Sequence, residues 1–198
     1  MVKLTNAILE AARALPEGAA ISAKELLHLG NRAAVDQALS RLAKRGELLR
    51  VSRGVYVRPV EGRFGTRPPS AESVVAGIAR LTGESIGTTG AAAANKLGLT
   101  TQVPVRMVYV TSGPSRRLTL GANEIELKHV PEWQVALTGR PAGDAIRALA
   151  WAGERGARKA LAAVRRKLAP EELEALSKQR SRLPTWLAQE VSALAFHA

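Results

Sequence analysis

The sequence predicts an α+β fold, in which a small N-terminal module precedes a mixed, mainly helical second domain with a small β-sheet. Apolar residues recur at intervals of three and four over much of the chain, which is the period of a helix with one buried face. Alternation with a period of two replaces this pattern near residue 50 and again between residues 105 and 130, as in half-buried strands. Aromatic residues make up only 4% of a chain that is 46% hydrophobic, which favours helices packed closely through small side chains.

Two short helices are predicted at the N-terminus. The first covers residues 4–15 and ends where Pro16 and Gly18 interrupt the apolar pattern. The second begins at Ser22, which stands three residues before Glu25, the spacing of a capping box that satisfies two free backbone N–H groups.

A third, longer helix is predicted from Asn31 to about Arg45. Asn31 can cap its first turn, and Gly46 can end it. Apolar residues occupy one face of this helix and polar residues the rest. Two helices joined by a tight turn, here at Gly30, are the core of a helix-turn-helix, whose second helix enters the major groove of DNA.

A basic hairpin is predicted directly after the third helix. Apolar side chains alternate over residues 49–57, and Arg53 and Gly54 interrupt them at a turn position. A basic hairpin behind a recognition helix is a wing, which can reach phosphates or the minor groove. The order of elements therefore predicts a winged helix-turn-helix DNA-binding domain over residues 1–60.

The candidate DNA contacts lie on the polar face of the third helix and on the wing. Arginine can donate two hydrogen bonds to a guanine edge and glutamine can pair with adenine, whereas lysine and serine suit phosphates. Asp36 either holds Arg32 or another cation at helical spacing, or accepts from a cytosine amino group. Tyr56 is expected to pack at the base of the wing, and Arg58 is a further cation there. The predicted DNA-binding residues are Asn31, Arg32, Gln37, Ser40, Arg41, Lys44, Arg50, Arg53, Gly54 and Tyr56.

Residues 61–70 are rich in glycine, proline and arginine, which predicts an irregular linker. The second domain is then expected over residues 71–198, with strands near residues 105–111, 118–120 and 125–130. Its helices are predicted at residues 70–81, 88–97, 142–152, 154–168, 170–178 and 184–196.

One helix of this second domain presents a basic ridge outside its apolar stripe. The ridge consists of Arg155, Arg158, Lys159, Arg165 and Arg166. It suits an acidic protein partner, additional DNA contacts, or a face that is simply solvated.

The chain as a whole is strongly basic. It carries 29 lysine and arginine residues against 17 acidic residues, a formal charge of +12, which favours a polyanionic partner such as nucleic acid. A generally basic surface or ribosome association is also compatible with this charge. Up to Arg67 there are 12 basic and 6 acidic residues, so the charge is denser in the first third, where we expect the DNA-contacting surface.

Other classes of protein fit the sequence poorly. The absence of cysteine removes disulfides and thiolate chemistry. Charged and polar residues interrupt the N-terminal apolar run, and no apolar stretch is long enough to span a bilayer, so we expect a cytoplasmic protein. The motifs GxxxxGK[ST], GxSxG and HExxH are missing, and His28, His129 and His197 are isolated. We therefore expect no catalytic residues, no metal and no cofactor. Trp133, Trp151 and Trp186 are expected to anchor cores or an interface.

Two segments resemble a known family of proteins. They are LSRLAKRGELLRVSRGVYVRP at residues 39–59 and TTGAAAANKLGLTTQVPVRMVYVTSG at residues 88–113, and both resemble the AbiEi-like antitoxins and transcriptional regulators of abortive-infection toxin-antitoxin pairs, with the related DUF6088 group. The resemblance implies that the N-terminal module binds and represses the promoter of its own operon. It also implies that the protein opposes a cognate nucleotidyltransferase-like toxin. Arg53, Gly54 and Tyr56 match the family's wing motif, so the resemblance extends wing contacts to them.

Two classes of function thus follow from the sequence. The first is a promoter-binding repressor and antitoxin with double-stranded DNA as its partner, or a stand-alone regulator without a toxin. The second is a basic module that binds RNA or the ribosome. RNA readout normally uses exposed stacking aromatic residues, which are few here, so duplex DNA is favoured.

Overall fold

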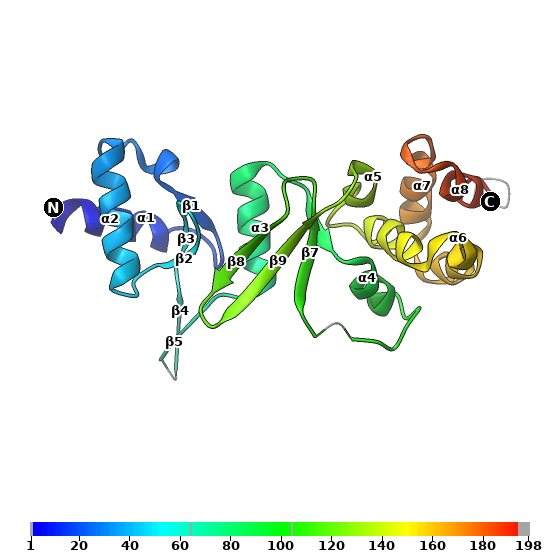
Figure 1. Cartoon of the computed structure of the whole chain (residues 1–198), viewed down its shortest axis with the longest axis horizontal. Helices are drawn as coiled ribbons and strands as arrows, with labels where there is room; N and C mark the ends of the chain where they lie inside the picture. Colours follow the sequence, from blue (N-terminus) through cyan, green and yellow to red (C-terminus); the bar gives the residue numbers. More distant parts are fainter. Residues whose placement is uncertain (1, 64, 104, 194–198) are drawn as a thin grey trace. The chain divides into compact units, whose positions relative to one another are not determined.

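The computed structural model describes residues 2–63, 65–103 and 105–193 and confirms the predicted α+β class (Figure 1). The chain forms two compact units. Unit 1 comprises Met1–Glu84 and Arg116–Glu126, and unit 2 comprises Ser85–Ser115 and Leu127–Ala198.

Unit 1 begins with a helix, a strand, a short helical turn, a longer helix and a hairpin. These elements are α1 (Val2–Arg13), β1 (Ala20–Ser22), the 3₁₀ helix η1 (Ala23–Leu26), α2 (Arg32–Lys44), β2 (Leu49–Ser52) and β3 (Val55–Val57). Strand β3 lies between β1 and β2 and pairs antiparallel with both. Ile8, Leu39 and Leu42 are completely buried in the core between the helices.

The second predicted helix is only the single turn η1. The backbone N–H of Ser22 donates to the Glu25 carboxylate at 3.1 Å, as the capping spacing predicts. The element stays short because the buried strand β1 extends through Ser22, leaving few residues before Gly30. Leu26 is buried in the core, which fixes the turn against α2.

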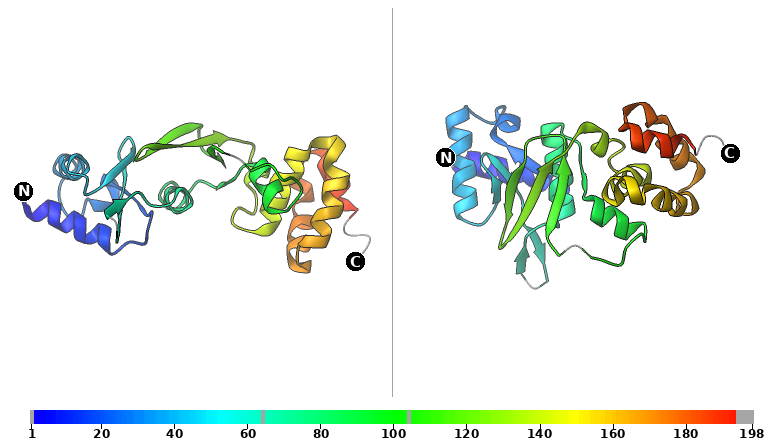
Figure 2. Two further views of the ribbon diagram at one scale, coloured as in Figure 1. Left: turned by 90° about the horizontal axis from the view of Figure 1, so that it is seen from below. Right: turned by 45° about the vertical axis from the view of Figure 1, so that its right-hand side comes forward.

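The residues expected to form an irregular linker, 61–70, contribute instead to a hairpin and a helix cap. Strands β4 (Val60–Gly62) and β5 (Gly65–Arg67) pair antiparallel and project from the body of unit 1 (Figures 1 and 2). The Ser70 side chain then caps α3 (Ala71–Thr82) by accepting from the Ser73 N–H at 3.1 Å.

The chain does not separate into its two units at these residues. Helix α3 packs on β1 inside unit 1, where Gly77 allows the backbones to approach closely. A Cβ atom at residue 77 would meet the carbonyl oxygen of Gly18 and would lie 2.8 Å from the Ala20 nitrogen. Strand β8 (Arg116–Leu120) also belongs to unit 1 and lies against β2.

Replacing Gly77 with alanine should therefore destabilise unit 1 by about 1–3 kcal/mol, the usual cost of overpacking a tight core contact. At an exposed helical position the same change stabilises a protein by about 0.5–1 kcal/mol. Chemical denaturation followed by circular dichroism measures the effect, because unit 1 contains no tryptophan. An increase in the free energy of unfolding would contradict the close approach of α3 and β1.

Unit 2 joins short strands to a group of helices. Its strands are β6 (Ile86–Thr88), β7 (Met107–Thr111) and the end of β9 (Asn123–His129), and its helices include α4 (Gly90–Lys96), α5 (Glu132–Val135), α6 (Pro141–Lys167), α7 (Pro170–Lys178), η2 (Arg180–Arg182) and α8 (Thr185–Ser192). The sheet order is β6-β7-β9-β8, and the division between the units falls within β9. Helices α4, α6, α7 and α8 enclose the core of unit 2 (Figure 2).

The two helices predicted at residues 142–152 and 154–168 together make up α6, and a kink at Gly153 separates them. This residue has φ 67° and ψ 176°, so it interrupts the helical backbone between the two predicted segments. The last predicted helix, residues 184–196, corresponds to α8, and its final three residues lie outside the described part of the chain.

Candidate nucleic-acid interface

Helix α2 separates a buried face from an exposed polar face. Val35, Ala38, Leu39 and Leu42 are buried against the rest of unit 1. The opposite face, which includes Gln37, Ser40, Arg41 and Lys44, is exposed. Asn31 caps the helix as predicted, because its Oδ1 accepts from the Ala34 N–H at 2.9 Å.

The N-terminal half of the exposed face is organised by an ion pair. The Nε of Arg32 donates to Oδ2 of Asp36 at 2.8 Å. Of the roles left open by the sequence, Asp36 thus holds Arg32 at helical spacing. Both side chains are largely exposed, so the pair adds little stability and mainly orients the guanidinium.

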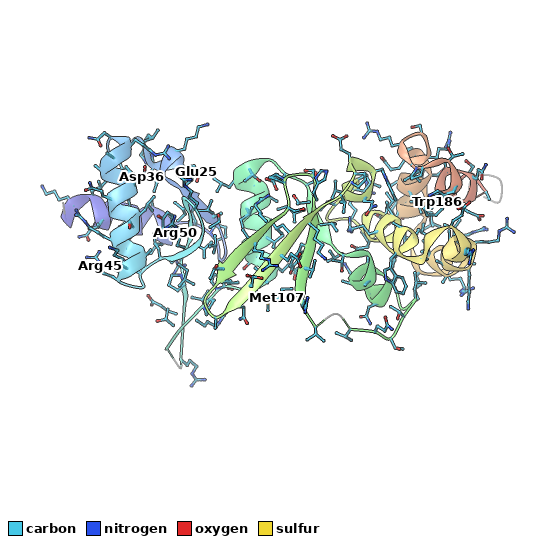
Figure 3. The ribbon with its side chains drawn as sticks, in the orientation of Figure 1. Glu25, Asp36, Arg45, Arg50, Met107 and Trp186 are labelled. Atoms are coloured by element: carbon cyan, nitrogen blue, oxygen red, sulfur yellow. The ribbon has the colours of Figure 1, made fainter. Side chains whose placement is uncertain are left out.

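The rest of the face, toward the C-terminus of α2, carries four of the predicted contacts: Gln37, Ser40, Arg41 and Lys44. Nη2 of Arg41 lies 3.4 Å from Oε1 of Gln37, a long hydrogen bond that can open when another acceptor approaches. Lys44 follows one turn later and is exposed. Arg45 points to Glu47, with 2.6 Å between Nε and Oε1. Figure 3 labels Asp36 in the N-terminal half of α2 and Arg45 directly after its last residue.

The β2–β3 hairpin adds cations next to this helix. Arg50 is exposed on β2, with Nε 3.4 Å from the Ser52 carbonyl oxygen (Figure 3). Arg53 is exposed at the turn, and Gly54 has φ 74°, a left-handed conformation that glycine adopts without strain. The exposed turn therefore presents a cation with no carboxylate bonded to it among the described residues.

Two hairpin residues lie deeper than a DNA contact requires. Tyr56 is only 6% exposed and packs in the core of unit 1, so it supports the hairpin from beneath and does not present its ring to a partner. Arg58 is partly buried, and its Nε has no hydrogen-bond partner in the described part of the chain. Of the residues predicted for the wing, Arg50, Arg53 and Gly54 are the accessible ones.

The predicted basic ridge belongs to α6 and hence to unit 2. All five residues are exposed, and only Arg158 has an ion-pair partner among the described residues, Glu190 at 3.5 Å. The remaining members of the ridge are Arg155, Lys159, Arg165 and Arg166.

A buried ion cluster that the sequence patterns did not predict lies at the other end of α6. Asp144 and Arg147 are almost completely buried, with 2.6 Å between Asp144 Oδ1 and Arg147 Nη2. Lys96 from α4 donates to Asp144 Oδ2 at 2.7 Å, and Thr88 from β6 donates to Oδ1 at 3.2 Å. Asp144 therefore connects a strand and two helices of unit 2.

Two opposing effects set the pKa of Asp144. Burial raises it, whereas hydrogen bonds from Lys96 and Arg147 and their positive charges lower it, and the net shift is below the ordinary value. The signal in the sequence was an Asp and an Arg three residues apart in a helical segment whose other residues, 142–149, are all apolar or glycine. Such a pair must share one buried face.

The charge is spread over both units. Unit 1 contains 15 basic and 10 acidic residues, and unit 2 contains 14 and 7. The higher charge density expected for the N-terminal part is not found when the compact units are compared. The interface in unit 1 therefore depends on where its cations lie and not on an excess of charge.

Side chains suited to metal binding or acid-base chemistry do not gather in the described residues. No group of three or more His, Asp or Glu side chains is close enough to hold a metal ion there. His28 and His129 each contact a backbone carbonyl oxygen, at 3.1 and 2.9 Å, and His197 lies outside the described residues. Ser85 and Ser112 bond to each other through their backbones and the Ser112 hydroxyl. Within the same residues no helix combines the length and apolarity needed to cross a membrane.

These features define an α+β protein with an exposed polar helix and basic hairpin in one unit and a basic ridge in the other. The chain belongs to the DUF6088 family, a family of unknown function, whose model matches residues 7–173. No curated protein matches it significantly. Among solved structures, the crystal structure of the RV2827C protein from Mycobacterium tuberculosis is similar to 97% of this chain and 76% of that chain, with 18% identity and a TM-score of 0.48.

Proposed function

We propose that the protein binds double-stranded DNA sequence-specifically through unit 1, acting as a winged helix-turn-helix. The observation that carries the proposal is the exposed polar face of α2, capped by Asn31 and followed directly by the basic β2–β3 hairpin. A helix of this kind fits the major groove of B-DNA. In this proposal the basic hairpin acts as the wing and contacts the flanking phosphate backbone.

The residues divide into two roles in this proposal. Gln37 and Arg41 read base edges, because an amide and a guanidinium can each form two hydrogen bonds to a single base. Arg32, Ser40, Lys44, Arg50 and Arg53 contact phosphates and hold the helix in register. The Arg32–Asp36 pair places a cation beside the carboxylate, which reduces the repulsion between that carboxylate and a nearby phosphate.

We further propose that the bound DNA is the promoter of the protein's own operon and that the protein represses it and counteracts a nucleotidyltransferase-like toxin. This step is supported by the resemblance of residues 39–59 and 88–113 to AbiEi-like antitoxins, in a chain of the DUF6088 family. A promoter-reporter strain and a growth assay with the neighbouring gene test it. Repression together with rescue from toxicity supports the antitoxin role. Repression without rescue would mean that the protein is a regulator that acts without a toxin.

A basic module for RNA or the ribosome is the alternative. It predicts that a structured RNA competes with duplex DNA at equal concentration and equal salt. Specific duplex binding that RNA does not displace would exclude this alternative.

Replacing Arg53 with alanine should weaken binding to every duplex by a similar factor, because the residue is expected to contact a phosphate and not a base. The slope of log affinity against log salt should fall in magnitude by about 1. Fluorescence anisotropy at several salt concentrations measures both effects. If Arg53→Ala changed the preference among sequences and left the salt dependence intact, Arg53 would instead read a base.

A further inference from the structure

Unit 2 contains a groove beside the basic ridge of α6. It has a volume of about 310 Å³. Small residues of α6 form one wall, and the segment after α4 forms the other. The apolar lining includes Leu99, Trp151, Gly156, Ala160 and Ala163.

A large aromatic side chain at this groove is exposed to solvent. Trp151 lines the groove and is 46% exposed, although the sequence predicts that it anchors a core or an interface. The loop that supplies Leu99 continues through Val103 and Val105, which are 73% and 98% exposed. A contiguous apolar surface rimmed by polar residues marks a site that another molecule covers, and tryptophan is among the residues enriched in binding hot spots.

The charged side chains that line the groove are both positive. Lys159 and Arg166 line it, and they lie seven residues apart on one face of α6, about 10 Å along the helix axis. Neither has an ion-pair partner among the described residues, and no carboxylate lines the groove there. Another groove along α6, at Arg158 and Arg165, differs because it contains a carboxylate, Glu190, which already pairs with Arg158.

We propose that this groove binds an acidic, amphipathic segment of a partner protein. Apolar side chains of the partner would cover Trp151 and the small residues of α6, and its carboxylates would pair with Lys159 and Arg166. The geometry matches the usual anatomy of a protein interface, with an apolar centre and a charged rim. This binding is separate from the DNA contacts proposed for unit 1.

Two other occupants fit less well. A second copy of the chain would bring together units that each carry 14 basic and 7 acidic residues, so they repel each other. A single-stranded nucleic acid suits the cations, but such sites stack successive bases on several aromatic side chains, and Trp151 is the one aromatic residue lining this groove. The small apolar residues that line the groove also favour an apolar partner over a phosphate backbone.

A designed peptide tests the proposal on the full chain. The probe is a fluorescein-labelled helical peptide with leucines on one face and glutamates on the other, and its binding is followed by anisotropy. We expect Trp151→Ala and the double variant Lys159→Glu/Arg166→Glu each to weaken binding at least about tenfold. The matched control is Arg180→Glu/Arg182→Glu, which changes the charge of unit 2 equally outside the groove and should have a much smaller effect.

Further probes distinguish an amphipathic partner from simple charge attraction and from nucleic acid. A peptide with serine in place of leucine should bind weakly, and equal binding would mean charge attraction alone and overturn the proposal. No binding of the leucine peptide at about 1 mM, or equal binding by all variants, would also overturn it. Tighter, Trp151-dependent binding of a single-stranded oligonucleotide would assign the groove to nucleic acid. The affinity for operator duplex, measured on the same variants, tests the function of unit 1 independently.

Discussion

A double variant with alanine at Gln37 and Arg41 is expected to lose most of the discrimination between the operator and random DNA. Each bidentate contact to a base contributes about 1–3 kcal/mol of discrimination, and the two side chains are neighbours on the exposed face of α2, 3.4 Å apart. Binding to random duplex should fall much less, since only one cation is removed. Competition titrations with operator and scrambled duplexes at one salt concentration measure the difference.

The control for this variant is Arg80→Ala. Arg80 is an exposed cation on α3 in the same unit, so its replacement changes the net charge equally and leaves α2 intact. The two single variants, Gln37→Ala and Arg41→Ala, show whether one base contact dominates. If the double variant and Arg80→Ala weakened operator and random DNA by the same factor, α2 would not read the sequence.

The second large effect is expected at Asp144, where alanine should lower the free energy of unfolding of unit 2 by about 3–5 kcal/mol, the usual cost of breaking a buried ion pair. The change leaves Arg147 buried with one remaining hydrogen bond among the described residues, to the Gln134 carbonyl oxygen at 3.5 Å. Gly87 packs directly on the guanidinium, so the Arg147 side chain has no room to move on that side.

Tryptophan fluorescence reports this effect selectively, because all three tryptophans belong to unit 2. The control is Glu174→Ala, which removes an exposed pair with Lys178 and should leave stability nearly unchanged. A loss at Asp144 no greater than that at Glu174 would mean that the buried cluster contributes nothing.

The Asp144 carboxylate should also make the stability of unit 2 depend on pH. The pKa of Asp144 is lowered in the folded chain, so the folded state holds the charged form more strongly than the unfolded state does. The stabilisation is fully present above the unfolded pKa, near 3.8, and is lost as the pH falls through the lower, folded pKa. Between neutral and acid pH, unit 2 of the Asp144→Asn variant should therefore lose less stability than unit 2 of the wild type. Denaturation at several pH values measures this loss. Parallel curves of stability against pH for the two proteins would mean that the carboxylate is not involved.

Local signals in the sequence predicted the elements that carry the candidate interface. The cap at Asn31, the apolar face of α2 and the turn at Gly54 depend on neighbouring residues only. The break between the two predicted helices around Gly153 is of the same kind.

What the sequence did not predict depends on contacts between distant segments. Strands β1 and β6 are three residues long and exist because they pair with β3 and β7, which no local pattern encodes. The placement of α3 in unit 1 follows from the close contact of Gly77 with residues 18–20, and the exposure of Trp151 follows from packing in the same way.

The most direct test of sequence-specific DNA binding is a salt-controlled titration of the full chain on its own upstream region and on a scrambled duplex of equal length. We expect a preference of about a thousandfold or more for the upstream region at physiological salt, and we expect Gln37→Ala/Arg41→Ala to remove most of it. Equal affinity for both duplexes, falling steeply and in parallel with salt, would contradict the proposal, because it would mean that the basic surface attracts polyanions without reading their sequence.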